Sequence, residues 1–161
     1  MDRYVRATRR EVFPFPAERA RAAVQNIKGI EDTEVKADRV EVFPDSEREG
    51  TYAVVGRFAG MPWRSRFAYR LHEAGFHSHK VAGETPRSWE ISGGFVVADV
   101  DARTCLVIHY EDYGLPRYLV PLKPLIGRYL AWSMRVELRA LREVVANGGS
   151  ATAASSRSGT E

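Results

Sequence analysis

The segment from Trp63 to His72 alternates between two kinds of side chain more strictly than any other part of the chain. One set of positions is aromatic, small or aliphatic, and the positions between them are mostly arginine, ending in histidine. A period of two residues is typical of a β-strand with one face in a protein core and the other face in water. Any fold for this chain must therefore place a strand here with its aromatic face buried.

The same period of two continues on both sides of this segment. We expect strands over residues 4–13, 35–43, 51–58, 63–72, 76–81, 87–100 and 104–113. Because short turns separate the consecutive strands from residue 35 onward, that part of the sheet is predicted to be an antiparallel meander. The Gly93-Gly94 pair lies inside one of these strands and predicts a bulge that bends the sheet.

A helical period appears in two segments, one near each end of the chain. Residues 17–27 form the first, and a turn or short second helix follows through Asp32. The second segment begins at Leu122 or Leu125 and ends at Ala146, with prolines near its start. Its apolar positions form two stripes that cover roughly two-thirds of the circumference. A helix that is apolar over so much of its surface needs a sheet wrapped around it.

The composition bounds the function classes. The 161 residues, 44% of them hydrophobic, suit one domain over residues 1–146, and the Gly-, Ser- and Ala-rich residues 147–161 predict a disordered tail. No apolar run is long enough to span a membrane and no signal peptide is recognisable, so we expect a cytoplasmic protein. The single cysteine, Cys105, excludes an internal disulfide and a multi-cysteine metal site. We expect no metal and no cofactor.

The net charge of +3 comes from 20 arginines and 4 lysines against 21 acidic residues. This balance permits an acidic partner without requiring one. The arginines at positions 57, 64, 66 and 70 could follow phosphates, but they are better explained as the solvated face of two strands. We therefore expect no nucleic-acid partner, and a monomer or weak dimer.

The order of elements resembles the START/Bet v1-like (SRPBCC) superfamily of polyketide cyclases and lipid-transport proteins. The residues that carry the resemblance are Thr8 to Val24, Trp89 to Tyr113 and the helix ending Leu138-Arg139-Ala140-Leu141-Arg142. The chain is also similar in size and arrangement to START-like proteins that accompany enediyne antibiotic pathways. The resemblance implies an α+β helix-grip fold, in which a curved antiparallel sheet of about seven strands wraps a long C-terminal helix. It also implies a cavity for a hydrophobic small molecule.

The candidate ligand-binding residues are mostly aromatic side chains on the inward-facing positions. Their indole N–H and phenol O–H groups need partners, which a cavity holding water or a polar-edged ligand would supply. This set comprises Tyr52, Phe58, Trp63, Phe67, Tyr69, Trp89, Phe95, Tyr110, Tyr129 and Trp132.

Polar side chains add to this set. Ser133 and Glu137 lie near the middle of the long helix's apolar arc, where Glu137 is either a general base or the partner of a buried arginine. His77 and His79 share a strand face opposite Lys80 and are expected to point inward if Lys80 is solvated. His109 lies on a strand whose two faces are not distinguished by sequence. The candidate catalytic residues are therefore Glu137, His79 and His109.

These features favour binding of a polyketide-like or lipid-like molecule, in a carrier or self-resistance role in bacterial secondary metabolism. The alternative is a polyketide cyclase or aromatase acting on a bound intermediate. The residues do not decide between the two, since the same fold hosts both functions.

Overall fold

The computed structural model describes residues 2–148, which form one seven-stranded sheet and a small set of helices. The elements in chain order are β1 (Tyr4–Phe13), α1 (Ala17–Gln25), the 3-10 turn η1 (Ile27–Gly29), α2 (Ile30–Thr33), β2 (Arg39–Pro44), β3 (Glu49–Phe58), β4 (Met61–His72), β5 (Gly75–Lys80), β6 (Glu90–Asp99), β7 (Cys105–Gly114), the 3-10 turn η2 (Arg117–Leu122) and α3 (Lys123–Ala146).

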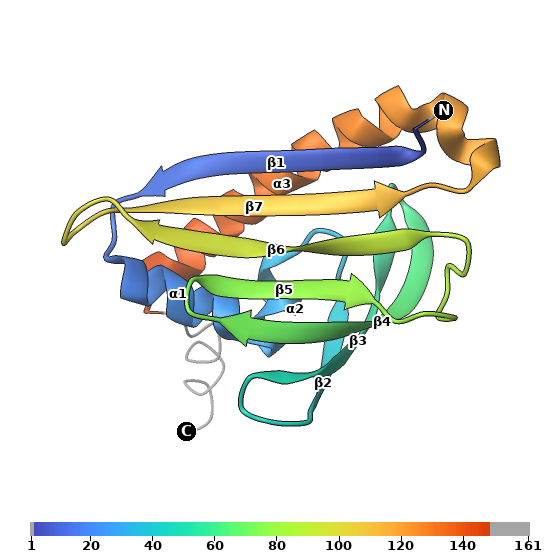
Figure 1. The fold of residues 1–161 in the computed structure, drawn as a ribbon. Coiled ribbons are helices and arrows are strands. Elements are labelled where there is room, and N and C mark those ends of the chain that lie inside the picture. The colour runs from blue at the N-terminus through green and yellow to red at the C-terminus, as the bar shows by residue number, and fades with distance from the viewer. Residues whose placement is uncertain (1, 149–161) are drawn as a thin grey trace, which may run out of the picture.

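The strands pair in the order β1-β7-β6-β5-β4-β3-β2, and every pair is antiparallel. Five of the six pairings join strands that follow one another in the chain, which confirms the predicted meander. The sixth joins β1 to β7 and brings the start of the chain against its last strand. Figure 1 shows α3 running behind the β1–β7–β6 part of the sheet, while β2 and β3 turn away from it.

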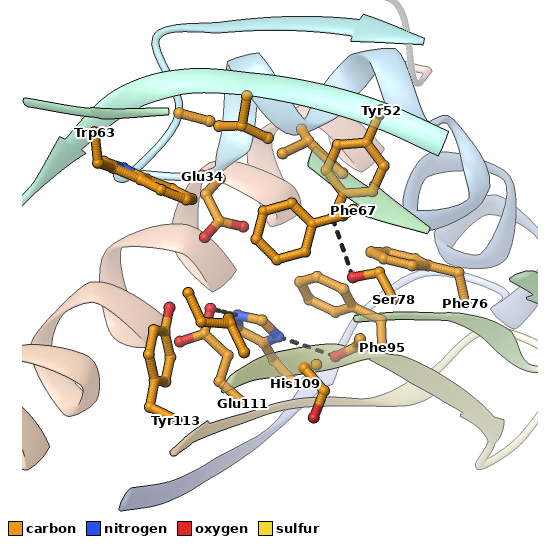
Figure 2. A pocket seen from close by; sticks show the side chains of 17 residues that line it. Glu34, Tyr52, Trp63, Phe67, Phe76, Ser78, Phe95, His109, Glu111 and Tyr113 are labelled. Carbon is orange, nitrogen blue, oxygen red and sulfur yellow. Dashed lines mark hydrogen bonds and ion pairs between the residues drawn. The ribbon is translucent and has the colours of Figure 1, made fainter. Parts of the chain in front are cut away.

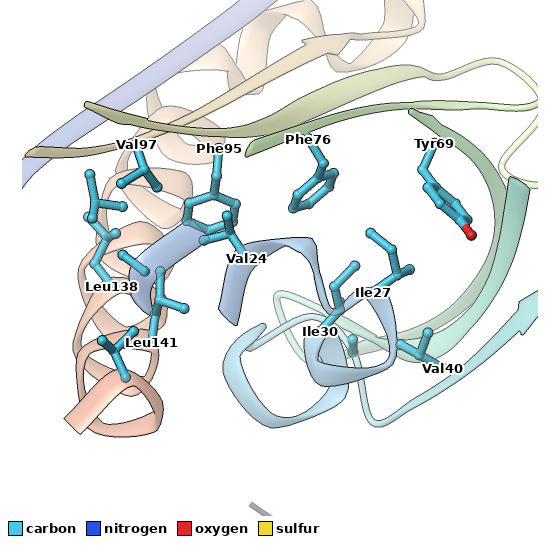
Figure 3. Packing of buried hydrophobic residues seen from close by; sticks show 14 of the residues in the cluster. Val24, Ile27, Ile30, Val40, Tyr69, Phe76, Phe95, Val97, Leu138 and Leu141 are labelled. Carbon is cyan, nitrogen blue, oxygen red and sulfur yellow. The ribbon is translucent and has the colours of Figure 1, made fainter. Parts of the chain in front are cut away.

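Two apolar clusters hold the helices against the sheet. The larger one joins α1, α2 and the C-terminal half of α3 to the sheet, through residues such as Val24, Phe95 and Leu138 (Figure 3). The smaller one lies between β1, the end of β7 and the first half of α3, where Val5 and Leu130 are buried. Two separate apolar clusters thus pack α3 against the sheet, the arrangement that the helix-grip interpretation predicted.

The buried part of the α3 surface is narrower than the sequence predicted. Ser133, Glu137 and the stripe that includes Leu130 and Leu138 are buried, but Leu125 and Trp132 are 63% and 46% exposed. The sheet covers one side of the helix only, because α3 crosses the β1 end of the sheet. The second apolar stripe is therefore left at the edge of the contact, and the inward placement of Trp132 is wrong.

The expected bulge at Gly93-Gly94 is also wrong. Both glycines keep regular register with β5 on one side and β7 on the other. A Cβ on Gly94 would stand 2.0 Å from the carbonyl oxygen of Phe76, and one on Gly93 would stand 2.7 Å from that of Tyr110. The glycines therefore let neighbouring backbones approach closely within an unbroken ladder.

Two strands differ clearly from the sequence prediction, and the other strands differ from it by two residues or fewer at each end. The strand expected over 35–43 begins only at Arg39, because residues 34–38 form a turn. The expected strand over 87–100 is shorter and spans Glu90–Asp99. The proposed domain limit coincides with the end of α3 at Ala146, and the expected disordered tail lies outside the described residues apart from Asn147 and Gly148. Among the described helices, none has the length and apolar character needed to cross a bilayer.

Candidate functional site

An internal cavity lies between the sheet and the segment that follows α1. Its free volume is about 50 Å³, which is room for a few water molecules. Five strands, β3 to β7, and the residues around α2 supply its walls, and α3 contributes none (Figure 2). Its lining residues are Ile30, Glu34, Ala37, Tyr52, Val54, Trp63, Phe67, Phe76, Ser78, Ile91, Ser92, Gly93, Gly94, Phe95, His109, Glu111 and Tyr113.

An apolar groove lies beside this cavity. The two share Trp63, Ile91 and Tyr113 as common walls. The groove has about 350 Å³ of free volume, and no charged side chain lines it. Its remaining walls are Phe58, Met61, Pro62, Pro86, Trp89, Tyr118 and Leu119. A molecule spanning both would meet an apolar entrance and a polar interior.

The polar character of the interior comes from a buried ion cluster centred on Lys36. Lys36 is 1% exposed, and its Nζ lies 2.6 Å from Glu137 Oε1, 3.0 Å from Glu34 Oε1 and 3.1 Å from Glu111 Oε1. Ser133 Oγ stands 3.4 Å from the same nitrogen and donates to the Leu130 carbonyl. One ammonium group thus joins carboxylates from the turn after α2, from β7 and from α3.

His109 extends the cluster towards the cavity. Its Nε2 lies 2.9 Å from Glu137 Oε2, its Nδ1 lies 3.1 Å from the Gly94 carbonyl oxygen, and its ring stacks on Phe95 with centroids 4.1 Å apart. Both ring nitrogens face acceptors, so the doubly protonated imidazolium satisfies both contacts. Burial lowers the pKa of His109, but the hydrogen bond to Glu137 and the nearby carboxylates outweigh it and raise the pKa above its usual value.

The two inner carboxyl groups respond oppositely to this environment. Burial raises the pKa of Glu137, but Lys36 and His109 more than offset it and hold the pKa at about 2. Burial raises the pKa of Glu111 to about 7, because Lys36 offsets it only in part and Glu137 and Glu34 add to it. Glu137 is thus a firmly ionised structural carboxylate, whereas Glu111 can gain or lose a proton near neutral pH.

The alternation of β7 explains how these groups reach the interior. Cys105, Val107, His109, Glu111 and Tyr113 are all buried, and the residues between them are only partly buried. This settles the face that the sequence left open. Sequence reasoning missed Glu111, although it shares its parity with His109, and it missed Lys36, whose place in a turn gives no periodic signal.

Most of the expected aromatic lining is present. Tyr52, Trp63, Phe67 and Phe95 line the cavity, and Phe58, Trp63 and Trp89 line the groove. Tyr69 is buried in the larger apolar cluster, and Tyr129 packs against Phe58 with ring centroids 4.8 Å apart. Ser133 and Glu137 are buried as expected, yet they lie in the ion cluster and do not line the cavity. The partner of Glu137 is a lysine and a histidine, not the arginine that was one of the alternatives.

Three expected residues lie on the outer face of the sheet. His77 and His79 are exposed, and Tyr110 is half-buried, with its hydroxyl 2.9 Å from His77 Nδ1. The inward placement of the two histidines is wrong because Lys80 has the same parity as the buried Phe76 and Ser78. The inward placement of Tyr110 is wrong because it lies between His109 and Glu111, which occupy the buried face of β7. Lys80 escapes the interior only because it ends the strand, where its Nζ donates to the Glu84 carbonyl.

A metal ion is not required to explain the cluster. His109, Glu111 and Glu137 offer ligand atoms that all lie within 4.8 Å of one another. The ammonium group of Lys36 already contacts two of these carboxylates, so a cation is built into the chain at this place. The arrangement can orient a polar ligand group and can exchange a proton with it at His109 or Glu111.

Comparison with known proteins identifies the fold. No protein-family model matches the chain, and a search of curated proteins finds no match either. Among solved structures, the Zhui aromatase/cyclase from Streptomyces sp. R1128 is similar, with a TM-score of 0.71 at 11% sequence identity. The match covers 93% of this chain and 98% of the aromatase/cyclase chain. A START superfamily protein from Mycobacterium smegmatis has a TM-score of 0.69 at 9% identity, covering 88% and 97%.

A third similar structure is human STARD10, with a TM-score of 0.73 at 9% identity, covering 91% of this chain and 66% of that one. At such low identities the likeness speaks for the arrangement of elements. The match spans nearly the whole of each of the first two chains, including the sheet order and the long last helix. The chain therefore has the START/Bet v1-like helix-grip fold that its sequence resembles.

Proposed function

We propose that this protein binds a hydrophobic small molecule, polyketide-like or lipid-like, inside the sheet. The observation that carries the proposal is the aromatic cavity with the uncharged groove beside it, which share Trp63, Ile91 and Tyr113 as lining residues. Such an apolar recess with a few convergent polar groups is the usual form of a small-molecule site. The similar structures, an aromatase/cyclase and START proteins, support the same ligand chemistry.

The surface charges and the cysteine bear on the partners and the cellular compartment that we propose. Four arginines of the outer face are exposed, and one of them pairs with Glu49 at 2.8 Å, which supports the interpretation of a solvated sheet face; they are Arg57, Arg64, Arg66 and the paired Arg70. Cys105 is a buried free thiol, which suits a reducing, cytoplasmic compartment. We propose a monomer or weak dimer that carries or sequesters its ligand in secondary metabolism.

Tryptophan fluorescence tests the binding site directly. Trp63 lines the cavity and Trp89 the groove, whereas Trp132 is exposed on α3. Titration with the neutral dye N-phenyl-1-naphthylamine is expected to quench tryptophan emission in a saturable way. The Trp63→Phe variant is expected to lose much of this quenching, and the matched Trp132→Phe variant to keep it. Absence of saturable quenching, or equal behaviour of the two variants, would contradict the site.

A second candidate function is cyclisation or aromatisation of a bound polyketide intermediate. The specific observation in its favour is that His109 and Glu111 both line the cavity and both have shifted pKa values. A charged imidazole and a carboxyl group near its pKa form a suitable acid–base pair. The test is turnover of a linear poly-β-keto thioester mimic, followed by absorbance of the aromatic product. Product formation that Glu111→Gln abolishes while dye binding persists would establish catalysis, and no product would leave the binding role alone.

A further inference from the structure

The charged side chains that line the cavity are predominantly acidic. Glu34 and Glu111 line it together with His109. No lysine or arginine is among the lining residues. Figure 2 shows Glu34 on one side of the space and Glu111 with His109 on the other. This is the reverse of the whole chain, whose net charge is +3. The acidic lining is therefore a local feature, and the buried ammonium group of Lys36 contacts both carboxylates, at 3.0 Å and 3.1 Å.

The cluster holds more negative than positive groups. Counted with Glu111 ionised, Glu34, Glu111 and Glu137 provide three carboxylates, whereas Lys36 and an imidazolium at His109 provide two cations. Because the pKa of Glu111 is about 7, both of its forms are present at neutral pH, and a bound cation favours the ionised one. Within the described part of the chain, Glu111 Oε2 is buried and has no hydrogen-bond partner. Glu111 as a residue is only 6% exposed. A buried carboxylate oxygen without a donor is costly, and a ligand that brings a donor and a positive charge would satisfy it.

Aromatic rings surround these carboxylates. The cavity is lined by Tyr52, Trp63, Phe67, Phe76, Phe95 and Tyr113. The faces of such rings carry negative charge density and attract cations, most strongly where water is excluded. Carboxylates and aromatic faces around one space thus favour the same class of ligand group, an organic cation.

We propose that the ligand of this cavity carries a protonated amine, which binds at Glu111 and Glu34 while its apolar body fills the groove. The inference rests on the proposed binding function and specifies the chemistry of the ligand's inner end. Glu111 and Tyr113 are two residues apart on the buried face of β7, a separation of about 7 Å along a strand. Because Tyr113 also walls the groove, an aromatic body joined to the amine by a short alkyl chain spans the two compartments.

Three probes of similar size test the charge preference. They are 2-(2-naphthyl)ethylamine, the neutral 2-(2-naphthyl)ethanol and the anionic 2-naphthylacetate, each measured with the full chain by isothermal titration calorimetry. We expect the amine to bind at least about tenfold more tightly than the alcohol, the order of one charge-assisted hydrogen bond. We expect the anion to bind most weakly of the three, because it would meet Glu34 and Glu111.

Substitutions at the two carboxylates test whether they cause the preference for the amine. Glu111→Gln keeps the shape of the side chain and removes its charge, so it is expected to reduce the amine's advantage over the alcohol to about threefold or less. Glu34→Gln is a second variant at a less buried position and is expected to act in the same direction. Glu143→Gln, on the exposed side of α3, is the matched control and is expected to change nothing. Melting temperatures show which variants are folded at the temperature of the titration.

The outcomes separate this inference from the proposed function. If the alcohol or the anion binds as tightly as the amine, the cavity takes a neutral or anionic group, and the inference is overturned while hydrophobic binding stands. If an amine preference survives in both Glu111→Gln and Glu34→Gln, the carboxylates are not its cause, and the inference is likewise overturned. If neither these probes nor the neutral dye binds, both the proposed function and this inference fail.

Discussion

Replacing Lys36 by methionine is the sharpest test of the buried ion cluster. Lys36 Nζ lies within 3.1 Å of three carboxylate oxygens, and the side chain is 1% exposed. Removing one partner of a buried ion pair costs about 3–5 kcal/mol, since it leaves uncompensated charge in the interior. His109 still pairs with Glu137, and Glu111 can take up a proton, so we expect a loss near the lower value, about 3 kcal/mol at pH 7.

Urea denaturation followed by circular dichroism measures this free energy of unfolding. For a chain of this length, a loss of about 3 kcal/mol corresponds to a fall in melting temperature of roughly 6–12 °C. Arg70→Met is the control, because Arg70 pairs with Glu49 on the exposed face, where an ion pair contributes about 1 kcal/mol or less.

The pH dependence adds a second signature. Without the ammonium group, the buried carboxyl groups hold protons to a higher pH than in the unfolded chain. The native variant then binds more protons than its unfolded state, so its stability rises as the pH falls from 8 towards 5. The deficit against the unmodified protein is therefore expected to shrink over that range. A deficit below about 1 kcal/mol that does not change with pH would refute the reasoning, because it would mean that water hydrates the cluster.

Three further perturbations have expected signs. The pKa of Glu111 is about 7 in the folded protein, so the stability that Glu111 contributes falls as the pH rises from about 4.5 to 7. Glu111→Gln is expected to remove that decline, which urea denaturation at a series of pH values measures. Gly94→Ala is expected to lose about 1–3 kcal/mol, because its Cβ would stand 2.0 Å from the Phe76 carbonyl oxygen; stability within 0.5 kcal/mol would contradict the close strand approach. Gly127→Ala, on α3 with Val5 at 3.8 Å as its nearest neighbour, is expected to gain about 0.5–1 kcal/mol by thermal melting, and a loss would contradict the open space there.

The fold was accessible from sequence because its signals are periodic. β4 alternates so strictly that its buried face, with Ser65, Phe67 and Tyr69, is read correctly without any structure. β1 and the start of α1 likewise have the predicted bounds, since Pro14 and Pro16 separate them. The main error on α3 concerned Trp132, because hydrophobicity alone does not tell which apolar stripe the sheet reaches.

The ion cluster was much less accessible. Its members come from a turn, a strand and a helix up to about a hundred residues apart, and only their meeting gives them meaning. Glu137 could be identified from the sequence, because a carboxylate among the apolar positions of a helix is unusual and needs a partner. Lys36 could not, because Trp63 Nε1 donates to its carbonyl oxygen and holds the turn inward, a tertiary contact without a local sequence signal.

The pairing of β1 with β7 has a consequence for how the protein is made. Tyr4–Phe13 leaves the ribosome before its partner Cys105–Gly114, which follows about a hundred residues later. At typical rates of synthesis this is a delay of roughly 5–20 s, during which the first strand has no edge to join. The strand carries three arginines among its ten residues, and this density of like charge discourages it from pairing with other nascent chains while it waits. Closing so long a loop also predicts slow refolding in comparison with helical proteins of the same size.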